Sequence, residues 1–163
     1  MLAASLTNGH VTYERALNAA EVGVYMAIHR DPAIYFPKLA REDEWAARFK
    51  VGKLYVVWPF KESSWQPRVM GDSGRSCGYM QVSTAHFSIT KMTCDDMRKS
   101  AYMGATAAAR VMEHLVKECG SLESAMGAYA SGHCGWAQDI VKNRCDLMGG
   151  CKDDVVVQSA PAT

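Results

Sequence analysis

Long apolar runs are absent from this sequence of 163 residues. No stretch approaches the roughly 18 consecutive apolar residues that a membrane-spanning helix needs. The opening stretch, MLAASLTNGHVTYER, also lacks the charged start and the long apolar middle of a signal peptide. We therefore expect a chain with no membrane span, and no signal peptide is visible in it.

Clustered positive charge is absent as well. The 18 Lys and Arg residues are spread along the chain and are offset by 17 Asp and Glu residues, so the formal net charge is only +1. Nucleic-acid binding depends on concentrated positive charge. We therefore expect no nucleic-acid partner.

Internal repeats and linkers are also missing. With 48% apolar residues, a chain of this length can bury the core of one domain without help from a partner. We expect a monomer with a single domain over residues 1–151. The last part of the chain, residues 152–163, is expected to be a frayed or extended tail.

Six cysteines are many for a small protein, and none of them forms a CxxC pair. An even number favours up to three disulfides and an oxidising compartment, although the sequence does not choose the pairing. Free buried thiols remain an alternative. We expect no metal site, because the cysteines and their neighbouring histidines match no familiar zinc-ligand spacing. The cysteines are Cys77, Cys94, Cys119, Cys134, Cys145 and Cys151.

Helical periodicity is clear in two segments of the chain. Residues 12–30 are predicted to form an amphipathic helix with one core-facing stripe. That stripe consists of Tyr13, Leu17, Ala20, Val24 and Ile28. Residues 95–118 are predicted to form a long helix, whose small and apolar residues face the core. These are Met97, Ala101, Gly104, Ala108, Met112 and Leu115.

The middle of the chain is more ambiguous. A helix is expected to begin around Glu42-Asp43-Glu44, with an interruption at Gly52. The next run, residues 54–58, is rich in β-branched and aromatic residues, so propensity alone favours a strand. Three glycines between residues 71 and 78 indicate a turn-rich loop or a small hairpin.

Part of that loop resembles another kind of enzyme. The tetrapeptide Gly71-Asp72-Ser73-Gly74 is similar to the segment around the nucleophilic serine of trypsin-like proteases, and Thr84-Ala85-His86 is similar to the segment around their histidine. That family places its histidine before its serine, whereas His86 follows Ser73 here. It is also built from β-barrels. We therefore interpret Ser73 as a turn residue.

Three blocks of the sequence resemble a different family. Glu62-Ser63-x-Trp65-x-Pro67 and then Gly78-Tyr79-Met80-Gln81-Val82 are similar to the "ESxxxP … GLMQ" signature of lytic transglycosylases and goose-type lysozymes. The segment of residues 124–132, SAMGAYASG, resembles their "ALAAYNAG" block. The resemblance implies a mainly α, lysozyme-like (α+β) fold: one helical catalytic domain with a small glycine-rich loop or β-hairpin beside the cleft. It also implies that residues 54–62 are helical, with a kink at Pro59.

The resemblance assigns Glu62 as the general acid and base that cleaves the β-1,4 bond between N-acetylmuramic acid (MurNAc) and N-acetylglucosamine (GlcNAc) in peptidoglycan. Our first interpretation is a lytic transglycosylase, which needs no second carboxylate. The alternative is goose-type hydrolysis with Asp72 positioning water, although the second acidic position is Ser83 here. A non-catalytic wall-binding or structural module is a further alternative. It is favoured by Pro59, which departs from the usual pattern of the family, and by Ala130, which stands where the family has an asparagine.

Other residues match the substrate-binding positions of the family. Tyr129 matches a tyrosine near the catalytic glutamate, and Ser63 matches the serine beside that acid. A wall of the sugar cleft is expected from Gly78, Tyr79, Met80 and Gln81. The family requires no cofactor or metal, and its partner is the peptidoglycan glycan strand. The protein is therefore expected to act outside the cytoplasm, or as a phage-encoded lysin.

Overall fold

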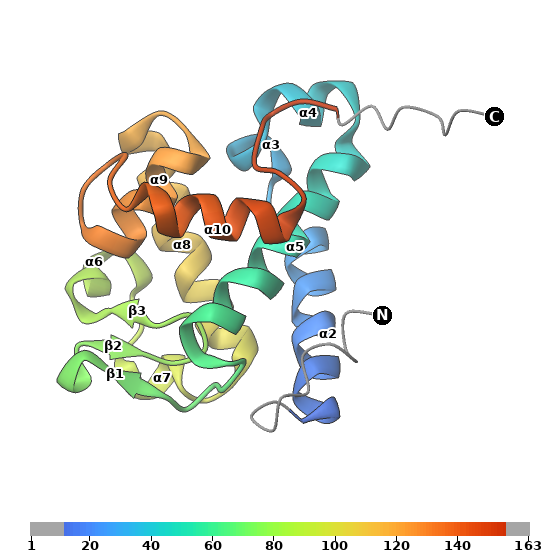
Figure 1. Cartoon of the computed structure of the whole chain (residues 1–163). Helices are drawn as coiled ribbons and strands as arrows, with labels where there is room; N and C mark the ends of the chain where they lie inside the picture. Colours follow the sequence, from blue (N-terminus) through green and yellow to red (C-terminus); the bar gives the residue numbers. More distant parts are fainter. Residues whose placement is uncertain (1–11, 156–163) are drawn as a thin grey trace.

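The computed structural model describes residues 12–155 of the chain (Figure 1). The first half is helical and contains α2 (Tyr13–His29), α3 (Pro32–Tyr35), α4 (Pro37–Glu42) and α5 (Glu44–Ser63). The middle contains β1 (Met70–Gly71), η1 (Asp72–Gly74), β2 (Ser76–Cys77), β3 (Val82–Ser83), η2 (Thr84–His86) and α6 (Phe87–Thr90). The last part contains α7 (Cys94–Met97), α8 (Ala101–Cys119), α9 (Leu122–Ser131) and α10 (Gln138–Met148). The expected mainly α fold with a small hairpin is confirmed.

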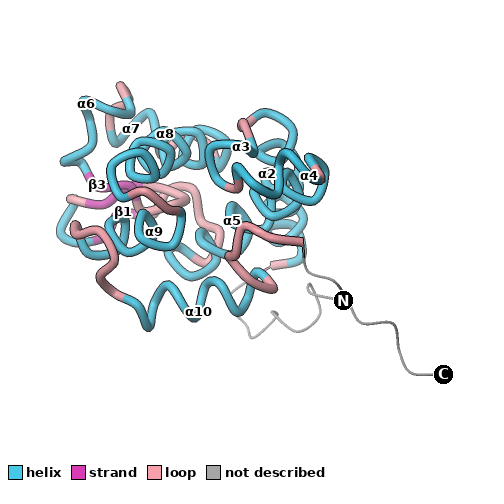
Figure 2. Tube along the Cα trace, turned by 90° about the horizontal axis from the view of Figure 1, so that it is seen from above, coloured by secondary structure: helices cyan, strands magenta, loops and turns pink. Residues whose placement is uncertain are grey.

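Helix α5 is the centre of this arrangement. It runs from α4 down to the small sheet, with α2 beside it and α10 across it, and Figure 2 shows α10 along one side of the molecule. Residues 54–58 lie within α5, so the strand that their propensity favours is wrong and the helix implied by the family resemblance is correct. Burial explains this: Leu54, Tyr55 and Trp58 are fully buried at helical spacing.

The orientation of α2 differs from the prediction. Its predicted core stripe faces outward, and Tyr13, Val24 and Ile28 are 68%, 59% and 55% exposed. Leu17 and Ala20 are exposed as well. The buried face instead carries Ala19, Val22, Gly23 and Met26.

Close contact between α2 and α5 accounts for this rotation. A Cβ atom on Gly52 would lie 2.9 Å from the carbonyl oxygen of Gly23 and 3.1 Å from the Cβ of Ala27. The two backbones can approach this closely only where side chains are small or absent. The small face of α2 therefore packs inward, and the large apolar side chains turn to the surface. Gly52 also continues α5, so the predicted interruption at this residue is wrong.

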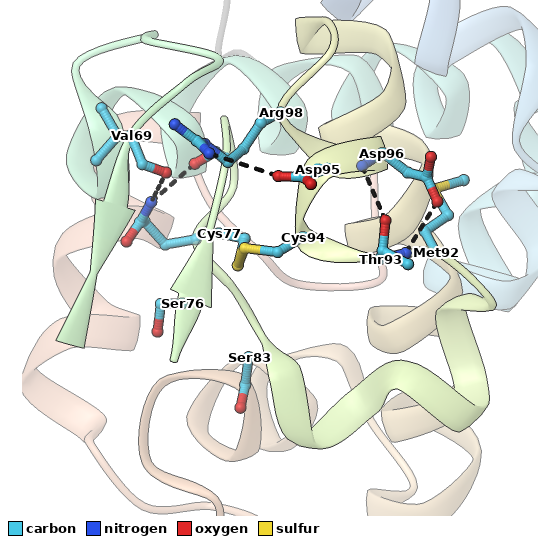
Figure 3. Close-up of a disulfide and its surroundings, with 12 residues drawn as sticks. Val69, Ser76, Cys77, Ser83, Met92, Thr93, Cys94, Asp95, Asp96 and Arg98 are labelled. Carbon is cyan, nitrogen blue, oxygen red and sulfur yellow. Dashed lines mark hydrogen bonds and ion pairs between the residues drawn. A yellow bond between two sulfur atoms is a disulfide. The ribbon is translucent and has the colours of Figure 1, made fainter. Parts of the chain in front are cut away.

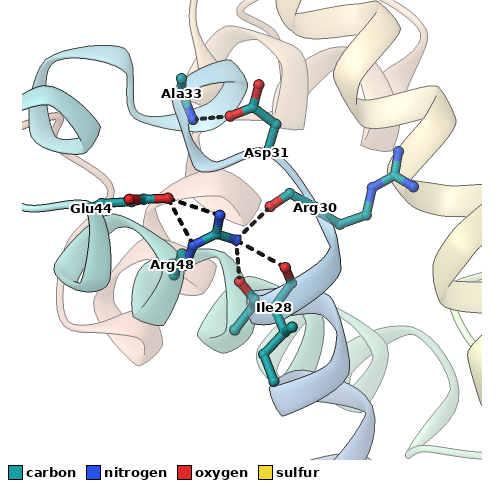
Figure 4. A network of polar contacts seen from close by, with 7 residues as sticks. Ile28, Arg30, Asp31, Ala33, Glu44 and Arg48 are labelled. Atoms are coloured by element: carbon teal, nitrogen blue, oxygen red, sulfur yellow. Dashed lines mark hydrogen bonds and ion pairs between the residues drawn. The ribbon is translucent and has the colours of Figure 1, made fainter.

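A polar contact strengthens the same crossing (Figure 4). The Arg48 guanidinium on α5 donates to the carbonyls of Ala27, Ile28 and Arg30 over 3.0 to 3.3 Å, and it pairs with Glu44 one turn earlier. These carbonyls belong to the last turn of α2 and its end, where no further helical N–H is available. Arg48 therefore holds the C-terminal end of α2 against α5.

The long helix predicted for residues 95–118 is divided in two. Helix α7 ends at Met97, and the Ser100 side chain then accepts from the Met103 N–H as the N-cap of α8. A serine that bonds the backbone in this way starts a new helix. All six predicted core residues are nevertheless buried, so the predicted face is confirmed although the helix is not continuous.

A partly buried polar network joins four helical segments. The Glu113 carboxylate on α8 accepts from Arg30 Nε at 2.8 Å and Nη2 at 2.7 Å, and from the Tyr35 hydroxyl at 2.6 Å. The hydroxyls of Tyr35 and Tyr55 lie 2.6 Å apart. Because each group has a partner, the network stabilises the packing of α3 and α5 on α8 without an unpaired charge.

The small sheet has the order β1-β2-β3 and is antiparallel throughout. Its strands are too short to be stable alone. Figure 3 shows the Cys77–Cys94 disulfide that joins β2 to the start of α7. Two other disulfides are formed, Cys119–Cys134 and Cys145–Cys151, so the prediction of disulfides is confirmed.

The described part of the expected tail, residues 152–155, has contacts with the domain. The Asp153 carboxylate accepts from the backbone N–H groups of Lys38 and Leu39 at the start of α4. Lys50 Nζ donates to the Lys152 carbonyl at 2.6 Å. The rest of that tail lies outside the described residues, and the domain boundary at residue 151 stays a prediction. Within residues 12–155, no helix is both long and apolar enough to cross a bilayer.

The two faces of α2 can be compared with a matched pair of substitutions. Val22→Ala is expected to lower the free energy of unfolding by about 2 kcal/mol, because it removes two methyl groups from a fully buried site. Val24→Ala makes the same chemical change on the exposed stripe, and we expect a change within about 0.5 kcal/mol. Urea denaturation under oxidising conditions measures both. Equal losses, or a larger loss for Val24, would contradict the observed orientation of α2.

Candidate active site

Glu62 lies in the last turn of α5, where that helix reaches the small sheet. Its side chain is only 25% exposed. The next residues turn the chain back: Ser64 adopts a left-handed conformation, and its N–H bonds the Phe60 carbonyl. Trp65 then packs its ring on Phe60. The acid therefore sits at a compact helix end and is largely shielded from water.

Pro59 is accommodated inside α5, one turn before the end of the helix. A proline in a helix lacks the N–H that would bond the preceding turn. Nearby carbonyls receive other donors: the Trp65 indole N–H donates to Val56 at 2.8 Å, and the Ser63 hydroxyl lies 3.1 Å from the Pro59 carbonyl. The departure from the family pattern at Pro59 thus leaves the segment that carries Glu62 helical.

The surroundings of Glu62 favour its protonated form. Burial raises the pKa of this carboxyl above its ordinary value of 4.5, and the negative charge of Asp72 raises it further. The positive charge of Arg144 acts in the opposite direction, and burial outweighs it. The partial negative charge at the C-terminus of α5 also disfavours a carboxylate there.

Arg144 and Tyr129, from two neighbouring helices, lie near the acid, and both pack on Trp58 of α5. Arg144 Nη2 on α10 lies 3.9 Å from Glu62 Oε1, and its guanidinium lies over the Trp58 ring. Tyr129 on α9 meets Trp58 edge to face, with ring centroids 5.4 Å apart. Burial raises the pKa of Tyr129 well above its ordinary value, and the charge of Glu62 adds to this effect.

Two hydrogen bonds attach the second sequence block to this centre. The Tyr129 hydroxyl donates to the Met80 carbonyl at 2.8 Å, and the Ser63 hydroxyl donates to the Tyr79 carbonyl at 2.7 Å. The side chains of Tyr79 and Met80 are fully buried and Ser63 is nearly so. These contacts give Ser63, Tyr79 and Met80 a part in packing, and their contact with a sugar stays a prediction.

Gly78 and Gln81 shape the turn between β2 and β3. Gly78 has φ +77°, and a Cβ atom there would lie 3.0 Å from the Met97 carbonyl oxygen, so the position requires glycine. The Gln81 side chain donates to the carbonyls of Gly78 at 2.9 Å and Val69 at 3.2 Å. Gln81 thereby holds the turn against the segment that precedes β1.

Asp72 lies on the exposed turn between β1 and β2, and its carboxylate accepts from the Ser76 hydroxyl at 2.7 Å. Ser83, at the second acidic position of goose-type lysozymes, lies opposite Ser76 in the sheet, and both are labelled in Figure 3. Ser73 is exposed on the same turn as Asp72. Burial lowers the pKa of His86 and the nearby His114 of α8 lowers it further, whereas the negative charge of Glu118 on the same helix acts in the opposite direction.

Comparison with known families shows the family of the segment that carries these residues. Residues 40–144 match the model of the transglycosylase SLT domain, which covers the end of α4 through most of α10. The chain belongs to the SLT domain family. A search of the curated proteins and a search of the solved structures gave no further match. Membership indicates cleavage of the glycosidic bonds of peptidoglycan as the general activity.

Two residues near Glu62, Trp58 and Arg144, were not indicated by the sequence. Trp58 lies in the segment of ambiguous propensity, and Arg144 is one of two basic residues on α10. No local pattern singles out either of them, because their importance comes from contacts between distant segments.

A separate cavity of 950 Å³ lies along α10, with Lys50, Trp136 and Lys142 in its wall and without any residue of the candidate site. Among residues 12–155, no group of three or more His, Cys, Asp or Glu side chains is placed to hold a metal ion.

The raised pKa of Glu62 predicts a pH-dependent effect on stability. A carboxyl whose pKa is higher in the folded state contributes stability that is complete below the unfolded pKa and is lost as the pH rises through the folded pKa. Glutamine does not titrate, so the Glu62→Gln variant does not lose stability in this way as the pH rises. The variant is therefore expected to gain stability relative to the parent as the pH rises from about 4 to about 8.

Urea denaturation across this pH range measures the difference between the two proteins. Glu123→Gln, at an exposed position on α9, is the matched control for the removal of a carboxylate. A constant difference between Glu62→Gln and the parent, or the same trend in the control, would show that Glu62 is not held in an environment that favours its protonated form.

Proposed function

We propose that this domain cleaves the β-1,4 bond between MurNAc and GlcNAc as a lytic transglycosylase, with Glu62 as general acid and then general base. The observation that carries the proposal is the largely buried Glu62 carboxyl, whose pKa is raised. Glu62 lies within the segment, residues 40–144, that matches the SLT domain. Glycosidic bond cleavage needs an acid that remains protonated near neutral pH. Burial at the end of α5 supports that state.

Glu62 gives up one proton and regains one proton in each turnover. Glu62 gives its proton to the glycosidic oxygen as the bond to the MurNAc C1 breaks and an oxocarbenium-like centre develops. The resulting carboxylate then takes the proton of the MurNAc C6 hydroxyl as that oxygen bonds to C1. The product is a 1,6-anhydromuramoyl end, no water is consumed, and Glu62 is protonated again.

Neighbouring residues are assigned supporting roles in the proposal. Tyr129 lies near Glu62, and its hydroxyl donates to the Met80 carbonyl. It therefore connects the surroundings of the acid with the segment proposed as the cleft wall. Gly78, Tyr79, Met80 and Gln81 would form that wall through their backbone, together with the partly exposed side chain of Gln81. Ser63 would keep the wall close to the end of α5.

Hydrolysis is a second candidate, and one observation favours it. The negative charge of Asp72 acts on Glu62, so the two carboxyls lie close enough to influence each other. In an inverting hydrolase a second carboxylate activates the attacking water. The Ser76 hydroxyl orients the Asp72 carboxylate, which would suit this role. Ser83 supplies no second acid in the sheet, and this favours the transglycosylase.

A non-catalytic module remains the third candidate. Of the two features that favour it, Pro59 leaves α5 intact as the support of Glu62. Ala130 is exposed on α9 and does not restore the amide of the family asparagine. Peptidoglycan is the proposed partner in every case. The three disulfides support a place of action outside the cytoplasm, for a bacterial enzyme or a phage-encoded lysin.

The acid can be tested by Glu62→Gln, which keeps the shape of the side chain but has no proton to donate. We expect release of soluble fragments from purified peptidoglycan to fall about 100-fold or more. Glu123→Gln, which removes an exposed carboxyl from α9, should remain as active as the parent. Turnover that survives in the Glu62 variant would rule out Glu62 as the acid. A parent without activity would favour the binding module.

The products separate the two reactions. Mass spectrometry of the digested peptidoglycan is expected to show 1,6-anhydro ends in both the parent and Asp72→Asn, because the internal C6 hydroxyl replaces water. The parent should also digest the substrate without forming new reducing ends. Reducing ends in the parent, lost together with activity in Asp72→Asn, would establish hydrolysis in place of transglycosylation.

A further inference from the structure

Arg144 occupies an unusual place for an arginine. Its side chain is only 13% exposed, and its guanidinium carbon lies 5.5 Å from the centroid of the fully buried Trp58 ring. A cation over an indole face is attracted by the ring, more strongly where water is excluded. The Trp58 contact therefore fixes the position of the guanidinium beside the end of α5.

The nitrogen atoms of Arg144 have different partners. Nη1 donates to the Asn143 side chain at 3.0 Å, and Nη2 faces Glu62 Oε1 at 3.9 Å. Nε is buried without a hydrogen-bond partner, and so is the indole nitrogen of Trp58. Leaving buried donors unpaired costs stability. Packing against Trp58 thus keeps Arg144 beside Glu62 although its hydrogen bonds are incomplete.

We propose that Arg144 is a positioning residue of this enzyme, which orients the Glu62 carboxyl and stabilises the carboxylate that forms after Glu62 has given up its proton. The proposal rests on the proposed function of Glu62 as general acid and base. A separation of 3.9 Å is an ion pair without a direct hydrogen bond. The carboxyl is therefore free to direct its proton at a substrate oxygen while the charge remains close.

The groups that face Glu62 come from three neighbouring elements. Arg144 is on α10, Asp72 is on the turn of the small sheet, and the Tyr129 phenol is on α9. Asp72 and burial favour the protonated acid, and Arg144 is the cation that opposes them. Without Arg144, Glu62 would hold its proton more tightly and its carboxylate would be less stable.

This balance matters because Glu62 acts twice in the proposed cycle. The first step needs a protonated acid, and the second needs a carboxylate that survives until it accepts the C6 hydroxyl proton. Arg144 lowers the free energy of the intermediate carboxylate. The Cys145–Cys151 disulfide, which begins at the next residue, ties the last turn of α10 to the chain that follows.

The test compares Arg144→Met with the parent, with Arg144→Lys, and with Lys142→Met as the control. Lys142 is an exposed cation on the same helix. The pH midpoint of the Glu62 carboxyl is followed by carbon NMR without substrate, with Glu62→Gln identifying the signal. The pH dependence of peptidoglycan turnover is measured in parallel.

In Arg144→Met we expect the Glu62 midpoint to move to higher pH, because a stabilising positive charge is lost. The alkaline limb of the activity profile should move in the same direction, and kcat should fall about 10- to 100-fold, as for displacement of a reacting group by about 1 Å. Arg144→Lys should keep the midpoint near that of the parent, since it keeps the charge, and Lys142→Met should leave both measurements unchanged.

Unchanged midpoints in Arg144→Met would overturn the proposal, as would a loss of activity that is equal at every pH. Arg144→Gln replaces the methionine variant if the latter does not fold. The NMR titration needs no turnover, so failure of the proposed function appears separately, as a parent that does not cleave peptidoglycan. In that case, a midpoint that still moves would support the electrostatic contact and overturn the role in the reaction.

Discussion

The close crossing of α2 and α5 at Gly23 and Gly52 is the constraint on which the rest of the fold depends. Because neither residue has a side chain, the two backbones come into contact and α5 lies in the middle of the domain. Arg48 holds the end of α2 in the same place. The crossing therefore sets the direction of α5 and the place where its last turn presents Glu62.

At that helix end, burial and charge act against each other. Burial favours a neutral Glu62, Asp72 acts in the same direction, and Arg144 acts in the other. A largely buried acid with no cation nearby would be hard to ionise, whereas a direct salt bridge would keep it charged. An ion pair at 3.9 Å lies between these extremes, which suits a group proposed both to give and to take a proton.

The disulfides compensate for elements that are too short to be stable by themselves. Cys77–Cys94 ties two-residue strands to a four-residue helix, and Cys145–Cys151 closes the end of α10 directly after Arg144. Each bridge spans a short loop, so it restricts the unfolded chain only locally. Their main effect is to hold the hairpin with Asp72 against α7, and the end of the helix with Arg144 against the segment that follows it.

The sequence by itself determined the helical character of the domain and the buried face of residues 97–115, and the family blocks indicated the helical segment that carries Glu62, because periodicity and such blocks are local properties of the chain. It did not determine which apolar face of α2 is buried, the break between α7 and α8, the pairing of the six cysteines or the place of Arg144 beside Glu62. Those features depend on contacts between distant segments: Gly23 can turn inward only because Gly52 lies opposite it, and Arg144 reaches Glu62 only because α10 crosses α5. Such contacts are decided by packing in three dimensions, which the spacing of residues along one helix does not specify.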